Sequence, residues 1–284
     1  MEIVRVEGLT FTYSGSEVPA VKDINLTMKE GEFVLLLGPS GCGKSTLCRC
    51  LNGLIPHFYA GKMDGKVVVA GMDVTKTPTY VLSQHVGMVF QIPENQLFSL
   101  TVENDVAFAL ENLGIPRDEI KRRVDFALRA VGIEELRGRS PFELSGGQQQ
   151  KVAIASILAL MPKLMLFDEP TSSLDPVSAK SVVDIISSIR KEFGTSIIVA
   201  EHRVELLADK VDRVIVMQEG SIIKDGKPKE VFVSEEFTPY GVPVPKVVSM
   251  AKGVNRHLRV FNDMPLSPEE FEQGIRGFLY DKVR

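Results

Sequence analysis

The sequence of 284 residues has no tryptophan and only three cysteines, which lie at positions 42, 48 and 50. An odd number of cysteines in one short stretch does not suggest a disulfide framework, so we expect a reduced, cytosolic protein. Cys48 and Cys50 lie two positions apart on a predicted helix, where they face different directions and make poor joint metal ligands. Secreted disulfide-rich proteins and zinc ribbons are therefore excluded.

Long apolar runs and an excess of basic residues are also missing. The longest apolar run, residues 152–161, is half of the roughly 18–20 residues that cross a bilayer. The first residues show no signal-peptide pattern. Lys and Arg number 33 against 37 Asp and Glu, which argues against nucleic acid as a partner. The length and the 44% hydrophobic content predict one large or two modest globular domains.

Two kinds of strand are expected. Apolar and polar residues alternate at residues 4–7 and 24–29, which predicts two half-exposed antiparallel strands followed by a turn at Glu30-Gly31. Residues 33–37, 164–167 and 197–200 are apolar with little or no alternation. Such runs are typical of a parallel sheet that is covered on both faces by helices.

Helical patterns lie between these strands. Leu47, Leu51 and Leu54 share one face of a helix that we expect Pro56 to end. Further stripes occupy residues 117–130 and 182–189, and Asp175-Pro176 begins the second of these helices as N-cap and first residue. Alternating strands and helices predict an α/β domain. Residues 92–162 show no convincing parallel strand and are interpreted as a mainly helical insertion.

A domain boundary is expected after Phe232, which divides the chain into residues 1–232 and 233–284. The connector that follows is stiffened by Pro239, Gly241, Pro243 and Pro245. Beyond it, Ser267-Pro268-Glu269-Glu270 forms a capping box. We expect this box to begin a short helix with an apolar side made of Phe271, Ile275, Phe278 and Leu279.

A glycine-rich turn follows residues 33–37. It reads Gly38-Pro39-Ser40-Gly41-Cys42-Gly43-Lys44-Ser45-Thr46 and matches G-x-x-x-x-G-K-[ST] between a strand and a helix, the context that this pattern requires. The backbone N–H groups of such a turn and the positive end of the helix bind phosphate oxygens. Lys44 is expected to reach the β- and γ-phosphates of a nucleotide, and the Ser45 hydroxyl to ligate Mg²⁺.

Further motifs follow in a fixed order along the chain. They are Gln91 after residues 86–90, Leu144-Ser145-Gly146-Gly147-Gln148 before a helix, Asp168-Glu169 at the end of an apolar strand, Ser173-Leu174-Asp175, and His202. Over roughly residues 3–232 the chain resembles the ATPases of the ATP-binding cassette (ABC) family. The resemblance implies a P-loop NTPase fold of the α/β class with an antiparallel β subdomain, a helical insertion subdomain and a small C-terminal extension.

The resemblance also implies catalytic roles. Asp168 and Gln91 would join Ser45 around Mg²⁺, which is the expected cofactor of ATP hydrolysis. Glu169 would polarise the attacking water, and a plain surface carboxylate is the alternative. His202 would contact the γ-phosphate.

Two further implied roles concern binding. Tyr13 would stack on adenine, with Phe11 as the second candidate. Ser145, Gly146, Gly147 and Gln148 would close the phosphate site of a second cassette, and Asp175 would act at the interface. Both motifs also have a simpler interpretation, because Ser and Asp are good helix N-caps.

Three segments point to one subgroup within the ABC ATPases. Residues 89–98, 101–108 and 200–203 look like the ATPases of energy-coupling factor transporters, which power vitamin and transition-metal uptake, and residues 235–284 are similar to the dimerising extension of that group. Ile92 and Lys151 depart from the usual pattern. The implied partners are a second ATPase subunit, identical or paralogous, a transmembrane coupling protein and a substrate-binding membrane protein, at the cytoplasmic face of the membrane.

In that group an acidic residue beside the glutamine pairs with an arginine of the coupling protein. Glu94 is the candidate here and Glu103 the second choice, with a solvated loop glutamate as the alternative. Two other functions remain open: an ATPase of another ABC importer class, or an ABC ATPase that takes no part in transport.

Overall fold

The computed structural model describes residues 1–233 and 242–283. The strands are β1 (Glu2–Tyr13), β2 (Val21–Lys29), β3 (Phe33–Leu37), β4 (Gly61–Val69), β5 (Met72–Asp73), β6 (Val86–Val89), β7 (Leu164–Asp168), β8 (Ser196–Ala200), β9 (Arg213–Gln218) and β10 (Ser221–Gly226). The α-helices are α1 (Lys44–Leu51), α2 (Leu54–His57), α3 (Thr79–Leu82), α4 (Val102–Asn112), α5 (Arg117–Val131), α6 (Gly146–Leu158), α7 (Pro176–Phe193), α8 (Pro228–Val233), α9 (Lys246–Asn255) and α10 (Pro268–Val283). Short 3₁₀ turns are η1 (Pro93–Asn95), η2 (Glu134–Leu136), η3 (Pro141–Glu143) and η4 (Val204–Leu206).

A six-stranded sheet forms the centre of the molecule, with the order β10-β9-β3-β8-β7-β6. The strands from β9 to β6 are parallel, and β10 is antiparallel at the edge. The register pairs Leu36 with Ala200 and Asp168 with Ala200. The carboxyl ends of β3, β8 and β7 therefore lie side by side, which is where open α/β sheets bind ligands.

The first two predicted strands are confirmed as an antiparallel pair, with Val4 opposite Met28 and Val6 opposite Leu26. They belong to a four-stranded sheet with the order β2-β1-β4-β5. Val4, Val6, Leu26 and Met28 are buried, so the alternating pattern separates an inner from an outer face.

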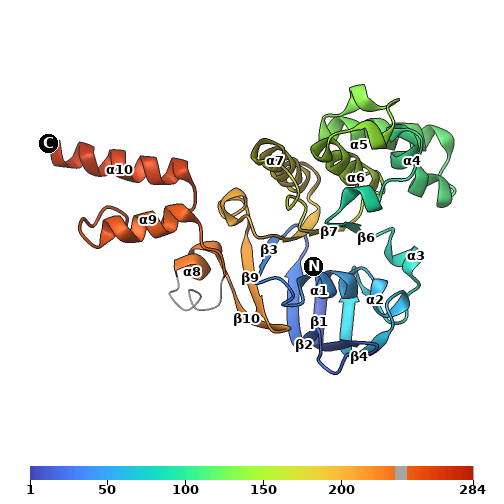
Figure 1. The fold of residues 1–284 in the computed structure, drawn as a ribbon, viewed down its shortest axis with the longest axis horizontal. Coiled ribbons are helices and arrows are strands. Elements are labelled where there is room, and N and C mark those ends of the chain that lie inside the picture. Colours follow the sequence, from blue (N-terminus) through green and yellow to red (C-terminus); the bar gives the residue numbers. More distant parts are fainter. Residues whose placement is uncertain (234–241, 284) are drawn as a thin grey trace.

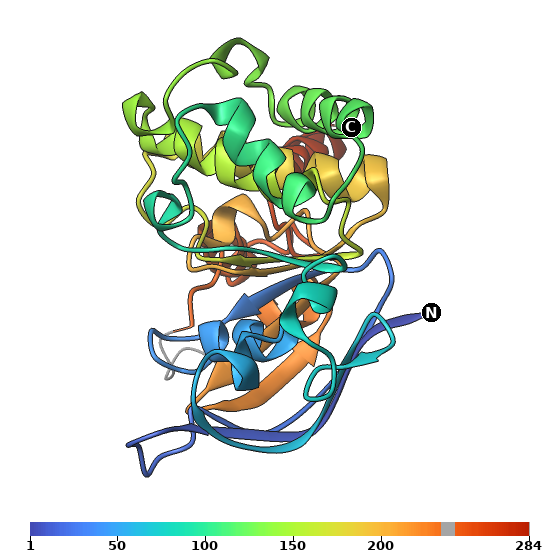
Figure 2. The same cartoon turned by 90° about the vertical axis from the view of Figure 1, so that its right-hand side faces the viewer.

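The two faces of the central sheet are covered differently (Figures 1 and 2). On one face Leu35, Leu37 and Phe167 pack in a core shared with α4–α7. On the other, Val34 and Leu36 pack in a second core with α1 and the antiparallel sheet. Helices therefore lie on both faces as expected, and on the second face the antiparallel sheet adds to the cover that α1 provides.

Residues 92–162 contain helices and 3₁₀ turns but no strand. Figure 2 shows these helices as a layer above the central sheet. The predicted apolar stripes are buried on α5 at Val124, Leu128 and Val131. The long helix α7 begins as expected, because Asp175 accepts hydrogen bonds from the N–H groups of Val177 and Ser178.

Helices α9 and α10 lie next to each other and extend away from the sheets (Figure 1). Ser267 caps α10 by accepting from the Glu270 N–H at 3.2 Å, but the Glu270 carboxylate returns to the N–H of Leu266, one residue earlier than a standard capping box. On the predicted apolar side of α10, Leu279 is 56% exposed. Pro239 and Gly241 of the predicted connector lie outside the described residues.

The predicted end of the first helix is wrong. Helix α1 ends at Leu51, and Gly53 adopts a φ of +81°, which breaks the helix before Leu54. Pro56 lies inside the short α2 instead. None of the helices within residues 1–233 and 242–283 has the length and hydropathy needed to cross a bilayer.

Candidate functional site

The glycine-rich turn wraps around the start of α1. Gly43 precedes the helix with a φ of +107°, and no side chain caps the first N–H groups of α1. Lys44 is buried, and its Nζ donates to the carbonyl oxygens of Gly38 and Pro39 at 2.9 and 3.1 Å. The free N–H groups and the folded-back ammonium form a positive cradle of the kind that binds phosphate.

A hydroxyl and a carboxylate meet beside this cradle. Ser45 at the start of α1 donates from Oγ to Asp168 Oδ1 at 2.8 Å. Burial raises the pKa of the Asp168 carboxyl above its usual value. In the described ranges no three His, Cys, Asp or Glu side chains gather as a metal-binding group. One carboxylate and one hydroxyl do fit Mg²⁺, which takes few protein ligands and completes its shell with phosphate oxygens and water.

Glu169 brings two other predicted residues together. Its Oε2 accepts from Gln91 Nε2 at 2.8 Å, and its Oε1 lies 3.0 Å from His202 Nε2. His202 Nε2 is also 3.4 Å from Lys44 Nζ. Glu169 has a φ of +49°, and its N–H is held by the carbonyl oxygen of Ala200 at 2.8 Å. A non-glycine residue in this region is strained, which is common for residues at functional sites.

Tyr13 lies beside the start of α1, where its hydroxyl is 3.2 Å from Thr46 Oγ1 and accepts from Arg49 at the same distance. The ring is half-buried, so part of it stays open to a ligand. Phe11 is fully buried and packs edge-to-face with Tyr13, with the two ring centroids 4.8 Å apart. Phe11 is therefore inaccessible to a base and supports Tyr13 from behind.

The Ser145–Gln148 motif forms a capping box at the start of α6. Ser145 Oγ accepts from the Gln148 N–H, and Gln148 Oε1 accepts from the Ser145 N–H. Ser145 and Gly146 are exposed. The motif thus presents a second helix N-terminus to solvent, and its N-cap interpretation is correct for this single chain.

The two cradles do not share one cavity. A hollow of about 380 Å³ is lined by Ala20, Ser40, Gly41, Gly43, Lys44, Ser45, Thr46, Gln91 and Glu169. Residues 145–148 are absent from this lining. Within the described residues, the motif at 145–148 therefore does not reach the phosphate cradle of its own chain.

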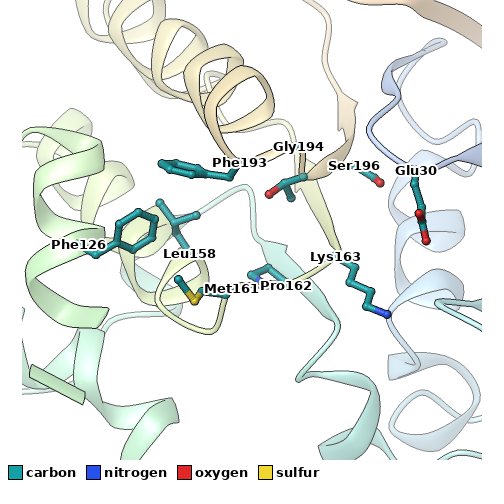
Figure 3. A pocket seen from close by; sticks show the side chains of 10 residues that line it. Glu30, Phe126, Leu158, Met161, Pro162, Lys163, Phe193, Gly194 and Ser196 are labelled. Atoms are coloured by element: carbon teal, nitrogen blue, oxygen red, sulfur yellow. The ribbon is translucent and has the colours of Figure 1, made fainter. Parts of the chain in front are cut away.

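A larger hollow of about 510 Å³ lies at the opposite edge of the sheet (Figure 3). The rings of Phe126 and Phe193 pack there with their centroids 4.9 Å apart, and Leu158 and Met161 also line the hollow. Lys163 and Ser196 place this hollow at the amino ends of β7 and β8. Its lining contains none of the predicted site residues, so size alone is a poor guide to the site.

The two candidate coupling residues differ in their surroundings. Glu94 is exposed in η1 and forms no ion pair within the described residues. Glu103 is paired with Arg137 at 3.4 Å. The apolar side chains of Ile92, Phe98 and Leu100, close to Glu94 in the sequence, are exposed, and the ring of Phe98 contacts that of the exposed Phe108. Glu94 is the freer carboxylate of the two.

Three residues of the site were not singled out from the sequence. Gln96 accepts from the Phe90 N–H and donates to the Met88 carbonyl oxygen, which holds the turn that carries Gln91. Glu201 is 1% exposed and accepts from the backbone N–H groups of His202 and Arg203. Arg203 donates to the Leu174 carbonyl oxygen. A carboxylate that directly follows the apolar run of residues 197–200 was the available signal for Glu201.

A family model and curated relatives both match this chain to the same family. The family model described as "ABC transporter" matches residues 21–172. The putative HMP/thiamine import ATP-binding protein YkoD of Bacillus subtilis is 41% identical over 267 residues, which are 93% of this chain and 49% of YkoD. The chain spans between two fifths and one half of the length of several curated relatives that it matches.

Solved structures agree with this match. CbiO1 from Clostridium perfringens, described as part of the ABC transporter complex CbiONQ, has a TM-score of 0.75 and 36% identity, covering 91% of this chain and 96% of CbiO1. The ATP-binding cassette MJ0796, a dimer bound to ADP and Pi in a post-hydrolysis state, has a TM-score of 0.70 and 29% identity, covering 79% of this chain and 98% of MJ0796. The expected fold class, a P-loop fold with an antiparallel β subdomain, is confirmed.

Proposed function

Because the chain belongs to the ABC transporter family of ATP-binding proteins, we propose that it hydrolyses MgATP as a subunit of an energy-coupling factor type importer. One observation carries the proposal of hydrolysis. Glu169 lies at the carboxyl edge of the sheet, where Gln91 and His202 hold its two oxygens next to the phosphate cradle. A binding module without catalysis has no need for a carboxylate held in this way.

The residues divide the reaction between them. The N–H groups of the turn bind the phosphates, and Lys44 exchanges its bonds to Gly38 and Pro39 for phosphate oxygens. Ser45 and Asp168, with Gln91 as a further ligand, would hold Mg²⁺, and the ion would supply positive charge against the phosphates. Glu169 accepts a proton from the attacking water at one of its carboxylate oxygens, while His202 orients the carboxylate and contacts the γ-phosphate.

A second cassette, identical or paralogous, would complete each site. The exposed N-terminus of α6 at Ser145 and Gly146 keeps first-turn N–H groups outside the capping box that suit an anion, and residues 145–148 do not line the chain's own phosphate cavity. Two chains placed head to tail satisfy both needs at once. Asp175, at the exposed start of α7, would then lie at the interface.

The C-terminal extension would add to this dimer. Met250, Leu258, Leu279 and Tyr280 are exposed on or beside α9 and α10. Apolar side chains grouped on a projecting pair of helices favour a contact with another chain.

A membrane coupling protein would dock near Glu94. The exposed apolar side chains of the same segment suit contact with an amphipathic helix, and an arginine on that helix would pair with Glu94. The cargo would be a vitamin or a transition-metal ion, chosen by a separate substrate-binding membrane protein. The complex would place this chain at the cytoplasmic face of the membrane as a peripheral subunit.

The test is Glu169→Gln, which keeps the side-chain volume and removes the base. Hydrolysis should fall about 10²- to 10⁴-fold while ATP affinity is retained, because general bases contribute that much to rate. The variant should also accumulate as an ATP-bound dimer, measured by light scattering during gel filtration. Hydrolysis at the normal rate would contradict the role of Glu169, and a monomer with ATP bound would contradict the shared sites.

A further inference from the structure

Glu201 is a buried charge that the catalytic scheme does not use. Its side chain belongs to the three-residue switch turn (residues 201–203) after β8 and is 1% exposed. Removing a carboxylate from water is unfavourable unless hydrogen bonds to its oxygens replace the lost hydration. Here backbone N–H groups supply the bonds, so the carboxylate organises the backbone around it.

The bonds of Glu201 connect two loops. Its Oε1 accepts from the N–H groups of His202 and Arg203 at 3.0 and 3.3 Å. Its Oε2 accepts from the N–H of Thr171 at 3.3 Å. Thr171 lies two residues after Glu169, so one carboxylate joins the turn that carries His202 to the loop that carries Glu169.

A second link runs in parallel. Arg203 donates from its guanidinium to the carbonyl oxygen of Leu174 at 2.9 Å. Leu174 directly precedes Asp175, the N-cap of α7. The switch turn is therefore tied at two points to residues 171–175.

We propose that Glu201 is a positioning residue for hydrolysis: its carboxylate, with Arg203, holds His202 against Glu169 and makes the switch turn and residues 171–175 move together. The proposal rests on the roles proposed above for His202 and Glu169. It gives the proposed interface loop a direct mechanical link to the histidine at the γ-phosphate.

Glu201→Gln tests the proposal with little change in volume. An amide has one acceptor oxygen, so whichever way it is turned, an NH₂ group faces backbone N–H donors that it cannot bond. We expect kcat to fall about 10- to 100-fold while KM for ATP changes less than about twofold, because only the geometry at the reacting end is disturbed. Glu205→Gln, the same change at an exposed position four residues later, is the matched control and should hydrolyse like the parent protein.

A spectroscopic measurement separates positioning from general damage. The chain has four histidines, so ring signals of ¹³C-labelled histidine can be assigned with His202→Ala as reference. Glu201→Gln should shift the His202 signal and leave the other three in place. An unchanged His202 signal and unchanged kcat would overturn the proposal. Parallel losses of ATP affinity, thermal stability and kcat would also overturn it, since they indicate a merely structural role.

Two comparisons keep the result interpretable. If Glu201→Gln does not fold, Arg203→Gln breaks only the Leu174 link and should lower kcat in the same way. Full activity of Arg203→Gln would then refute the proposed coupling of the switch turn to residues 171–175. Normal hydrolysis by His202→Ala would show instead that the proposed role of His202 is wrong. Loss of activity in His202→Ala with full activity in Glu201→Gln would refute this inference alone.

Discussion

Two glycines of the phosphate turn both have a positive φ but very different space around them. Gly41 has a φ of +80° and Gly43 a φ of +107°. A Cβ at Gly41 would meet nothing within 4 Å, whereas a Cβ at Gly43 would lie 2.4 Å from the carbonyl oxygen of Ala20. Comparing Gly41→Ala with Gly43→Ala therefore separates conformational strain from steric overlap.

The expected magnitudes follow from these distances. Both variants place alanine at positive φ, which costs about 1–2 kcal/mol. Only Gly43→Ala must also displace a backbone carbonyl, and overpacking of this kind typically adds about 1–3 kcal/mol. For a chain of this size about 2–4 °C of Tm corresponds to 1 kcal/mol, so Gly43→Ala should melt about 2–12 °C below Gly41→Ala.

The measurement is thermal unfolding followed by circular dichroism, without nucleotide and with a chelator present. Nucleotide must be absent because a bound ligand adds its own stabilisation and would mix binding with folding. Equal melting temperatures for the two variants, or a lower one for Gly41→Ala, would refute the assigned approach of Gly43 to Ala20.

Three further predictions concern the site. Loss of the N-cap in Ser145→Ala should lower the free energy of unfolding by about 0.5–2 kcal/mol, whereas Ser145→Gly should lower it by only a few tenths. Both variants should weaken ATP-driven dimerisation equally, because both lack the hydroxyl. Full dimerisation of Ser145→Gly would show that the hydroxyl takes no part in the partner's site. Asp168→Asn should raise the Tm of the nucleotide-free protein at pH 7, because burial raises the pKa of Asp168 and disfavours its ionised form in the fold. The higher Tm of Asp168→Asn should be fully present above the raised pKa of Asp168. It should disappear as the pH falls through that pKa to about 4, the ordinary pKa of Asp. A lower Tm of Asp168→Asn at pH 7 would contradict the burial argument. Glu94→Arg should leave basal hydrolysis intact and reduce co-purification with the membrane coupling protein, whereas unchanged assembly would remove Glu94 from the interface.

Local patterns in the sequence predicted strands that are buried on both faces and a helix that begins with an N-cap residue. The apolar runs of β3, β7 and β8 and the Asp175 cap of α7 depend on near neighbours in the chain, so they can be recognised without knowledge of the fold. Strand β9 carries a similar apolar run and was missed although the same rule would have found it.

Long-range features could not be obtained in this way. The alternation at residues 4–7 indicates a strand with one buried face, but it does not say that β4 pairs with its other edge or that this sheet covers α1. The bond between Glu201 and the Thr171 N–H is of the same kind, because these two residues lie 30 positions apart in the chain and meet only when β7 and β8 pair. A single sequence shows the carboxylate and not its donors.

The geometry of the site follows from one register. Asp168 pairs with Ala200 across β7 and β8, and Ala200 in turn accepts from the N–H of Glu169. This contact stabilises the positive φ of Glu169, which directs its carboxylate toward Gln91 and His202. A slip of one residue between β7 and β8 would send Asp168 to the opposite face of the sheet and separate it from Ser45. Three loops far apart in sequence thus form one site because the two strands allow a single alignment.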